Sequence, residues 1–102
     1  MTTESVSATA QEHRHTIEVV IRTPAGAEHR FEVHRHDRVD KTVRTAVTYF
    51  VAAGQLVDGD YGLALLRDGQ ATELTDSGRL DDYGIDRDEV LALFARGPQV
   101  DG

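Results

Sequence analysis

Residues 80–102 read LDDYGIDRDEVLALFARGPQVDG, and this stretch decides the fold of the chain. A polar turn leads into the apolar segment 89–95, and seven further residues, 96–102, end on glycine. Glycine has no Cβ, so a terminal glycine can enter a narrow channel and its carbonyl is open to attack. The stretch therefore indicates a strand followed by a C-terminal tail (residues 96–102) whose carboxylate is suited to activation and joining to another molecule.

Apolar side chains alternate along 89–95, which predicts a half-buried β-strand. Leu91 and Leu93 are expected to face the core, with Ala92 and Phe94 facing out. The opposite assignment, in which Val90 and Phe94 belong to the buried set, stays open. In the tail, Pro98 has no N–H to donate to a sheet and is expected to end strand pairing there.

Two alternating segments near the start of the chain, 16–23 and 28–33, predict an antiparallel hairpin. Pro24 and Gly26 mark the turn between them. The side chains expected to face the core are Ile17, Val19, Ile21, Phe31 and Val33.

One amphipathic helix is predicted from Asp37 through Ala53. Asp37 and Asp40 stand where a helix N-terminus favours carboxylates, and Gly54 is the expected C-cap. Apolar residues recur at helical spacing at Val39, Val43, Ala46, Val47 and Phe50.

The remaining segments complete the sheet. A third strand is predicted at 61–67, and the Asp68-Gly69 turn leads to a short strand at 71–74. A loop at 75–84 is expected to be anchored by Leu80, Tyr83 and Ile85. The simplest closed arrangement pairs the first and last strands in the middle of a sheet that packs on the helix. This is an α+β roll with a mixed four- to five-stranded sheet and one α-helix.

Composition limits the function. The 102 residues make one domain at most, and 11 Lys+Arg against 18 Asp+Glu give a net charge of −7, which argues against nucleic acid binding. The acidic balance implies a basic partner face, or serves solubility alone. There is no cysteine, so thiol catalysis and disulfides are excluded. No apolar run is long enough to cross a membrane and residues 1–10 show no secretory signal, so we expect a cytoplasmic protein.

Three regions follow from these patterns: a disordered N-terminal extension (1–14), the folded domain (15–95) and the flexible tail (96–102). Two repeated His-x-His pairs, at 13–15 and 34–36, are weak metal candidates, and the acidic segments 58–60 and 81–89 are weak calcium candidates. Solvated surface is the better interpretation of each, so we expect no metal site. No nucleophile elbow or phosphate loop is present, and we expect no enzymatic activity.

The order of elements is that of a β-grasp, and residues 80–85 make the match more specific. Leu80, Asp82, Tyr83 and Ile85 form a Leu-x-Asp-Tyr-x-Ile turn that, with the terminal glycine, resembles ubiquitin over residues 16–102. More closely, the chain looks like the bacterial ubiquitin-like protein modifiers encoded beside an activating enzyme, a conjugating enzyme and a deconjugating metallopeptidase.

The resemblance implies that Gly102 is adenylated with ATP by the activating enzyme, moved to an enzyme cysteine and attached to protein targets. The chain itself would bind no cofactor and act as a monomer, in some such systems in antiphage defence. The residues implied in tail recognition are Arg96, Gly97, Pro98, Gln99, Val100 and Asp101. Ala64 and Phe94 correspond to the patch through which ubiquitin contacts partners.

Two departures from ubiquitin affect these expectations. Asp101 stands where ubiquitin has the first of two glycines, so a cognate activating enzyme would need a basic residue there. The patch positions hold one small and one aromatic residue, which makes binding by ubiquitin's own partners unfavourable.

Lys41 is the only lysine, so chains of this protein would have to use Lys41 or the N-terminal amine. Two alternatives to a modifier remain. One is a sulfur carrier with a thiocarboxylate at Gly102, and the other is a β-grasp binding module that is never conjugated. Sulfur carriers usually end in two glycines and seldom carry an N-terminal arm, which favours the modifier.

Overall fold

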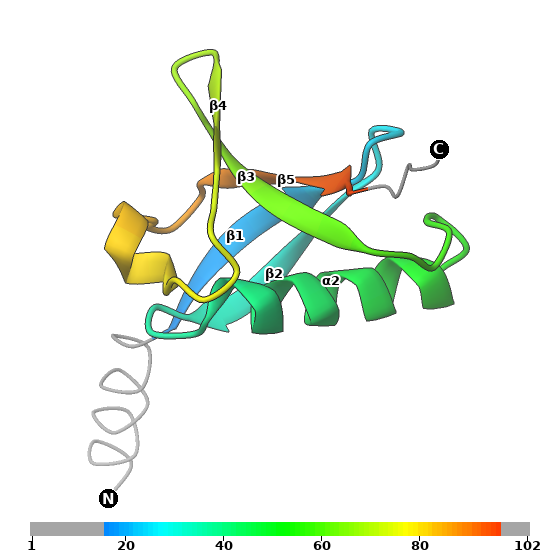
Figure 1. Ribbon diagram of the computed structural model, residues 1–102, viewed down its shortest axis with the longest axis horizontal. Coiled ribbons are helices and arrows are strands. Elements are labelled where there is room, and N and C mark those ends of the chain that lie inside the picture. Colours follow the sequence, from blue (N-terminus) through cyan, green and yellow to red (C-terminus); the bar gives the residue numbers. More distant parts are fainter. Residues whose placement is uncertain (1–15, 97–102) are drawn as a thin grey trace, which may run out of the picture.

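The computed structural model describes residues 16–96. The predicted N-terminal extension, residues 97–102 of the predicted tail and the first His-x-His pair lie outside the described residues. The elements are β1 (Thr16–Arg22), β2 (Glu28–His34), α2 (Val39–Ala52), β3 (Tyr61–Arg67), β4 (Gln70–Glu73), the short 3-10 helix η1 (Leu80–Tyr83) and β5 (Val90–Ala95) (Figure 1).

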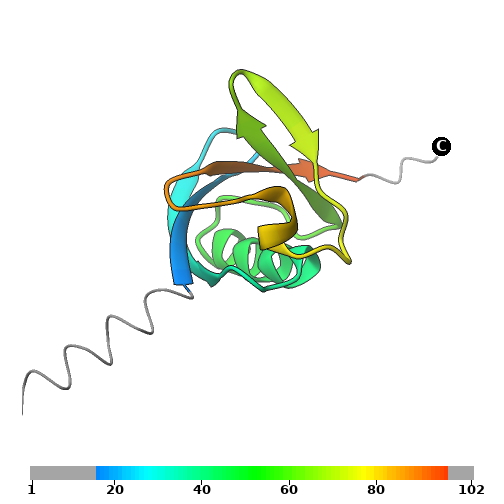
Figure 2. The same ribbon diagram turned by 90° about the vertical axis from the view of Figure 1, so that its left-hand side faces the viewer.

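The five strands form one mixed sheet in the order β2-β1-β5-β3-β4. β1 and β5 are parallel neighbours at its centre, and the other neighbouring strands are antiparallel. α2 lies across one face of the sheet (Figures 1 and 2). This is the predicted ubiquitin-like β-grasp roll, and the predicted pairing of the first and last strands is confirmed.

The core lies between the sheet and α2. The alternation in β1 and β2 places the expected side chains inside, and Phe50 of α2 is fully buried. Leu91 and Leu93 of β5 are buried while Val90 and Phe94 are only half-buried, so the first of the two face assignments is confirmed. Burial of apolar surface on this one side is the main force that holds the helix on the sheet.

Tight turns occur where the sequence predicts them. Asp68 and Gly69 have φ values of 55° and 76°, which is the left-handed conformation that a two-residue hairpin turn requires. At the end of α2 the C-cap is Ala53 and not Gly54 as predicted, and Gly54, one residue later, has the positive φ of 74°. The backbone thus reverses at the positions whose residue types tolerate a positive φ.

The start of the helix differs from the prediction. α2 begins at Val39, and Arg38 occupies the N-cap position without a side-chain cap. Asp37 lies in the turn before it, where its carboxylate accepts hydrogen bonds from the His34 N–H at 3.1 Å and from Lys41 Nζ at 3.3 Å. Asp37 therefore stabilises the β2–α2 turn, and Asp40 is the acidic residue of the first helical turn.

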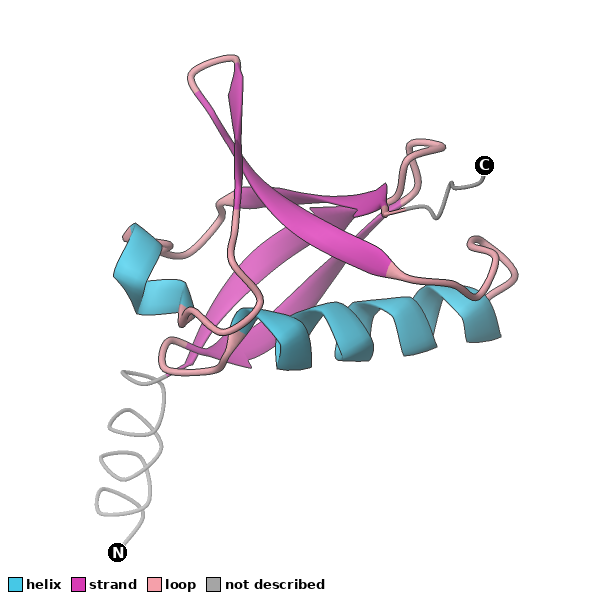
Figure 3. Ribbon diagram, viewed as in Figure 1, coloured by secondary structure: helices cyan, strands magenta, loops and turns pink. Residues whose placement is uncertain are grey.

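The predicted loop at 75–84 contains η1, which Figure 3 shows as a short helix at the left of the view, separate from α2. The Asp82 carboxylate accepts the Arg79 N–H at 2.9 Å, and Gly84 ends the helix with a φ of 67°. Leu80 is fully buried and Ile85 is buried, and Tyr83 packs against the core. The three predicted anchors therefore hold this segment, and the added finding is its helical form.

Candidate functional site

The face of the sheet opposite α2 carries apolar side chains from its central strands. In the register of β3 and β5, Ala64 pairs with Ala92 and Gly62 pairs with Phe94. Because side chains two residues apart on a strand share a face, these four positions lie on the side away from the core. We call the apolar set on this side the outer patch, which consists of Val20, Ala64, Leu66, Val90, Ala92 and Phe94.

The two predicted contact residues, Ala64 and Phe94, belong to the outer patch and are diagonal neighbours across two paired strands. Ala64 is 8% exposed, and Phe94 is half-buried. The sheet therefore brings the two predicted residues together. Phe94 provides most of the accessible surface of the pair, and Ala64 forms the floor beside it.

Ion pairs lie on both faces of the sheet. Arg22 binds Glu28 at 2.8 Å on the face of the outer patch, whereas Arg67 binds Glu89 at 2.6 Å on the face of the core, because residues 67 and 89 alternate with the outer-patch residues 66 and 90. The hydrogen bond from Arg67 to Glu89 raises the pKa of the Arg67 guanidinium. Such exposed pairs contribute little to stability, and of these two only the pair of Arg22 and Glu28 gives the outer patch a polar border.

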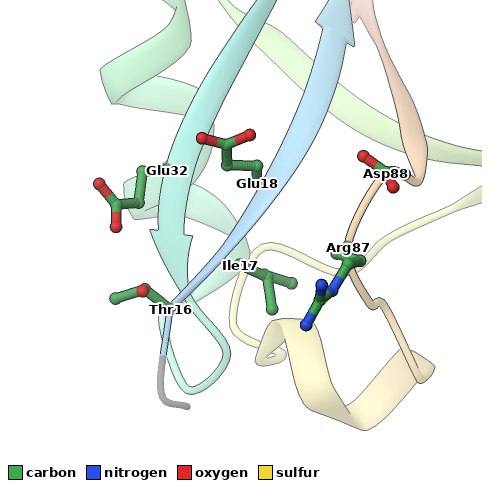
Figure 4. Close-up of a pocket in the computed structure, with 6 residues that line it drawn as sticks. All are labelled: Thr16, Ile17, Glu18, Glu32, Arg87 and Asp88. Atoms are coloured by element: carbon green, nitrogen blue, oxygen red, sulfur yellow. The ribbon is translucent and has the colours of Figure 1, made fainter. Parts of the chain in front are cut away.

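A recess of about 380 Å³ lies at the other end of β1, lined by Thr16, Ile17, Glu18, Glu32, Arg87 and Asp88 (Figure 4). Glu18 and Glu32 come from neighbouring strands, and Arg87 and Asp88 come from the loop before β5. Arg30 holds Asp88 at 2.9 Å and lies 3.6 Å from Glu18, so an ion pair occupies each of these two carboxylates. No nucleophile and base meet among these six residues, and we assign the recess no function.

We call Arg96, the first residue after β5, the tail root, and several contacts fix its position. Its backbone N–H donates to the Asp60 carbonyl at 2.9 Å. Its guanidinium donates two hydrogen bonds to the Asp76 carboxylate, at 2.9 and 2.7 Å, and its Cζ lies 5.9 Å from the centroid of the Phe94 ring. These contacts tie the first residue of the predicted tail to the domain.

The electrostatics of this ion pair follow from its geometry. The two hydrogen bonds from Arg96 lower the pKa of the Asp76 carboxyl, although partial burial opposes the shift. The same hydrogen bonds raise the pKa of Arg96, and Asp60 and Glu73 add smaller charge effects. Both groups are therefore charged at neutral pH, and the pair is bidentate, which is the stronger geometry for arginine and a carboxylate.

Gly62 makes this arrangement possible. A Cβ on Gly62 would lie 2.4 Å from Cζ of Phe94 and 2.9 Å from two nitrogen atoms of the Arg96 guanidinium. The phenyl ring and the guanidinium therefore occupy the space that a side chain on β3 would fill. Packing of Phe94 against the sheet and the position of Arg96 both depend on the absence of that methyl group.

The predicted chain acceptor, Lys41, lies in the first turn of α2. Its side chain is 64% exposed, and its ammonium pairs with the Asp37 carboxylate, whose own side chain is 17% exposed. The amine is thus accessible from solvent and lies on α2, away from the outer patch. Gly97, Pro98, Gln99, Val100, Asp101 and Gly102 lie outside the described residues, and their predicted roles stay predictions.

Sequence reasoning did not identify Asp76, Asp60 or Gly62 as parts of this site. Asp76 is one of several aspartates in polar turns, and nothing in its spacing relates it to Arg96, 20 residues away. The pairing becomes visible only when the sheet places the end of β5 beside the segment that follows β4. The adjacency of Gly62 and Phe94 could have been derived from a correct antiparallel register of the third and last strands.

Other predictions concern metals and membranes. Within residues 16–96, no group of three or more His, Asp or Glu side chains could hold a metal ion. His36 instead lies 2.9 Å from an oxygen of Asp81, in the contact between the β2–α2 turn and η1. In the part of the chain that the structure describes, no helix has the length and apolar character needed to cross a membrane.

Comparison with known proteins supports the fold alone. No family model matches the chain, and no curated protein matches it in sequence. Among solved structures, a protein designed de novo on the basis of ubiquitin superposes with a TM-score of 0.63 and 18% identity. The match covers 86% of this chain and 98% of the designed one. The chain thus has the ubiquitin-like β-grasp fold.

Proposed function

We propose that this chain is a ubiquitin-like protein modifier that is joined to target proteins through the carboxylate of Gly102. The observation that carries the proposal is the tail root. β5, at the centre of a ubiquitin-like sheet, ends at Ala95 and is followed by the anchored Arg96 beside the outer patch, and five further residues lead to Gly102. The outer patch and the start of the segment that leads to Gly102 therefore lie close together, which supports the proposal.

The proposed chemistry takes place on partner enzymes. The activating enzyme joins the Gly102 carboxylate to AMP from ATP and releases pyrophosphate. A cysteine thiolate of an enzyme then displaces AMP to form a thioester, and a target amine displaces the thiol to form an amide. The chain supplies the carboxylate and the recognition surface, performs no catalysis and binds no cofactor.

Partners follow from this chemistry. They are an activating enzyme, a conjugating enzyme, a deconjugating metallopeptidase and the protein targets. We propose that these proteins act together in a bacterial cytoplasm, in defence against phage. The net charge of −7 favours a basic docking face on the activating enzyme. Neither nucleic acid nor membrane is a proposed partner, and the chain is proposed to be a monomer.

The test is a denaturing immunoblot from the native host, with N-terminally tagged full-length protein compared with a variant that lacks Gly102. We expect bands of higher mass that persist in reductant and disappear in the variant. If only free protein is present, the intact mass should be measured. A gain of about 16 Da, the O→S exchange at the activated terminus, would support the sulfur carrier instead. An unaltered mass would support a binding module that is never conjugated.

A further inference from the structure

We propose that Asp76 is a positioning residue for the activation of Gly102. By holding Arg96, it fixes the direction in which the chain leaves the domain and so helps the activating enzyme take up the residues that follow. This inference rests on the proposed function. It names a residue of the segment between β4 and η1, far in sequence from the tail, as one that determines how efficiently the tail is used.

Two kinds of contact fix Arg96. The hydrogen bond from its N–H to Asp60 fixes its backbone, and the bidentate bond to Asp76 fixes its side chain. A single hydrogen bond would allow the guanidinium to rotate, whereas two parallel bonds fix its plane as well as its position. On the side of the sheet, the centroid of the Phe94 ring lies 5.9 Å from Cζ of Arg96, and the ring covers the guanidinium.

Asp76 is itself held in place. Its backbone carbonyl accepts the N–H of Asp40, in the first turn of α2, at 3.1 Å. Its neighbour Thr75 donates its N–H to the Tyr83 hydroxyl at 2.9 Å, and the Gly78 N–H donates to the Thr75 carbonyl at 2.9 Å. The carboxylate is therefore presented from a hydrogen-bonded segment that connects the helix to η1, so Arg96 binds a preorganised acceptor.

Preorganisation at residue 96 matters because a partner must order the residues beyond it. Ordering the side chain and the backbone of a residue costs conformational entropy, and that cost falls on the binding step. If the domain has already fixed Arg96, the partner does not have to. Loss of the ion pair is thus expected to weaken uptake of the tail and to leave the chemical steps unchanged.

Glu73 provides a matched control. It lines the same recess of about 530 Å³ as Asp76 and Arg96. Glu73 raises the pKa of Arg96 only through its charge, whereas Asp76 is hydrogen-bonded to it. Glu73→Gln and Asp76→Asn each remove one negative charge from the same recess. Only the second removes the bidentate contact, and the amide N–H groups of asparagine would face the N–H groups of arginine.

The first measurement is amide hydrogen exchange of full-length protein, followed at the Arg96 N–H by NMR. We expect exchange to be roughly five-fold faster in Asp76→Asn, the upper range for a partly exposed ion pair, and unchanged in Glu73→Gln. Asp76→Glu keeps the carboxylate on a longer side chain and should fall between the two. The thermal midpoint of each variant shows whether the domain remains folded.

The second measurement is the initial rate of conjugate formation in a native-host extract with ATP, at several concentrations of added protein. We expect Asp76→Asn to raise the apparent KM roughly three- to five-fold with little change in the maximal rate. Asp76→Glu should recover part of the loss, and Glu73→Gln should behave as wild type. Because the protein is the substrate here, a smaller folded fraction would by itself raise the apparent KM, so each concentration is corrected for the folded fraction found by thermal unfolding. A purely structural role would then leave the corrected KM equal to that of wild type.

The possible failures are distinguishable. If wild-type protein forms no conjugate, the proposed function fails and this inference fails with it. If wild type is conjugated and Asp76→Asn has the same KM, the inference alone is overturned. An equal effect of Glu73→Gln would overturn it as well, because charge and not the bidentate contact would then be responsible. Unchanged exchange at Arg96 in Asp76→Asn would show that Asp76 does not hold the tail root.

Discussion

Gly62 illustrates how one missing methyl group shapes the outer patch. Its backbone lies on β3 opposite Phe94, and the Phe94 ring covers the position where its side chain would stand. In most strands glycine is unfavourable, because it adds conformational freedom to the unfolded chain and packs nothing. Here the Phe94 ring of the neighbouring strand fills the space where a side chain at position 62 would lie, so the glycine allows the ring to pack against the sheet.

We expect Gly62→Ala to lower the free energy of unfolding by about 1–3 kcal/mol, because the new methyl group meets Phe94 at 2.4 Å and forces the ring or the strand to move. Urea denaturation measures the change. The control is Gly59→Ala, whose Cβ would meet the Tyr61 ring at an ordinary 3.7 Å. Equal stability of the two variants would contradict the packing described for Phe94.

The ion pair of Arg96 and Asp76 has a defined pH dependence. Arg96 lowers the pKa of Asp76 below its ordinary value of 3.8. A carboxylate whose pKa is lower in the folded state adds stability above its unfolded pKa and loses it as pH falls through the folded value. The pair should therefore be intact from neutral pH down to about pH 4 and break only in stronger acid.

The expected result is an NMR titration of the Asp76 carboxyl carbon with a midpoint below 3.8, which returns toward 3.8 in Arg96→Gln. The midpoint moves back because the guanidinium that stabilises the charged carboxylate is gone. A wild-type midpoint at or above 3.8 would be inconsistent with the bidentate contact.

Lys41 is the only side-chain amine of the chain, so under the proposed function it is the only lysine to which a second copy could be joined. We expect Lys41→Arg to abolish every lysine-linked chain and to leave attachment to other proteins unchanged. Mass spectrometry of tryptic branched peptides from the host measures the linkage. Asp37→Asn removes the carboxylate that pairs with the ammonium and serves as a control in which Lys41 remains. A lysine-linked chain in Lys41→Arg would disprove this prediction.

At the scale of single elements, the segment between β4 and β5 depends on side chains that reach across turns. The Tyr83 hydroxyl accepts the Thr75 N–H at 2.9 Å, and the ring contacts the core. At the N-terminus of η1, the Arg79 side chain donates a hydrogen bond to the His36 carbonyl, in the turn before α2, at 2.8 Å. η1 is thus joined both to the segment that carries Asp76 and to the turn before α2.

We expect Tyr83→Phe to reduce stability by about 0.5–1.5 kcal/mol, because the Thr75 N–H loses its acceptor while the ring stays in place. Urea denaturation measures the loss, and Tyr49→Phe, at a partly exposed tyrosine of α2, is the matched control. Because Thr75 precedes Asp76, amide exchange at Arg96 should also become faster in Tyr83→Phe. Unchanged exchange there would show that η1 and the tail root are independent.

The elements were predictable to different degrees for physical reasons. β1, β5 and α2 follow from periodic apolar residues such as Ile17, Leu91 and Phe50, because the same burial that makes the pattern also drives folding. The helical form of η1 was missed because a short 3-10 turn has almost no periodicity, although Leu80 indicated its burial. Asp76 could not be found from the sequence, since its role arises from a contact between elements distant along the chain.

At the scale of the whole molecule, the excess of acidic side chains gives the chain a long-range field. If the activating enzyme presents a basic face, this field raises the rate at which the two meet. Raising the salt concentration shortens the screening length from about 10 Å at 0.1 M to about 3 Å at 1 M. Attraction between the two surfaces should therefore weaken over this range.

We expect the apparent kcat/KM for conjugate formation in host extract to fall several-fold between 0.1 and 1 M NaCl, because screening slows the encounter. Sucrose at equal osmolality is the control, since it changes water activity without screening charge. A rate that does not respond to salt would support the alternative that the net charge of −7 serves solubility only.

The parallel pairing of β1 with β5 sets the order of events while the chain is being made. Ile21 and Leu91 lie side by side in the centre of the sheet, although 70 residues separate them. A growing chain can form the β1–β2 hairpin and α2 early, but β1 and β3 cannot be joined into one sheet until β5, the strand between them, has left the ribosome. A chain broken off before β5 would keep an open apolar surface and be exposed to proteases. Under the proposed function, only a finished, folded domain would then present Gly102 to an activating enzyme.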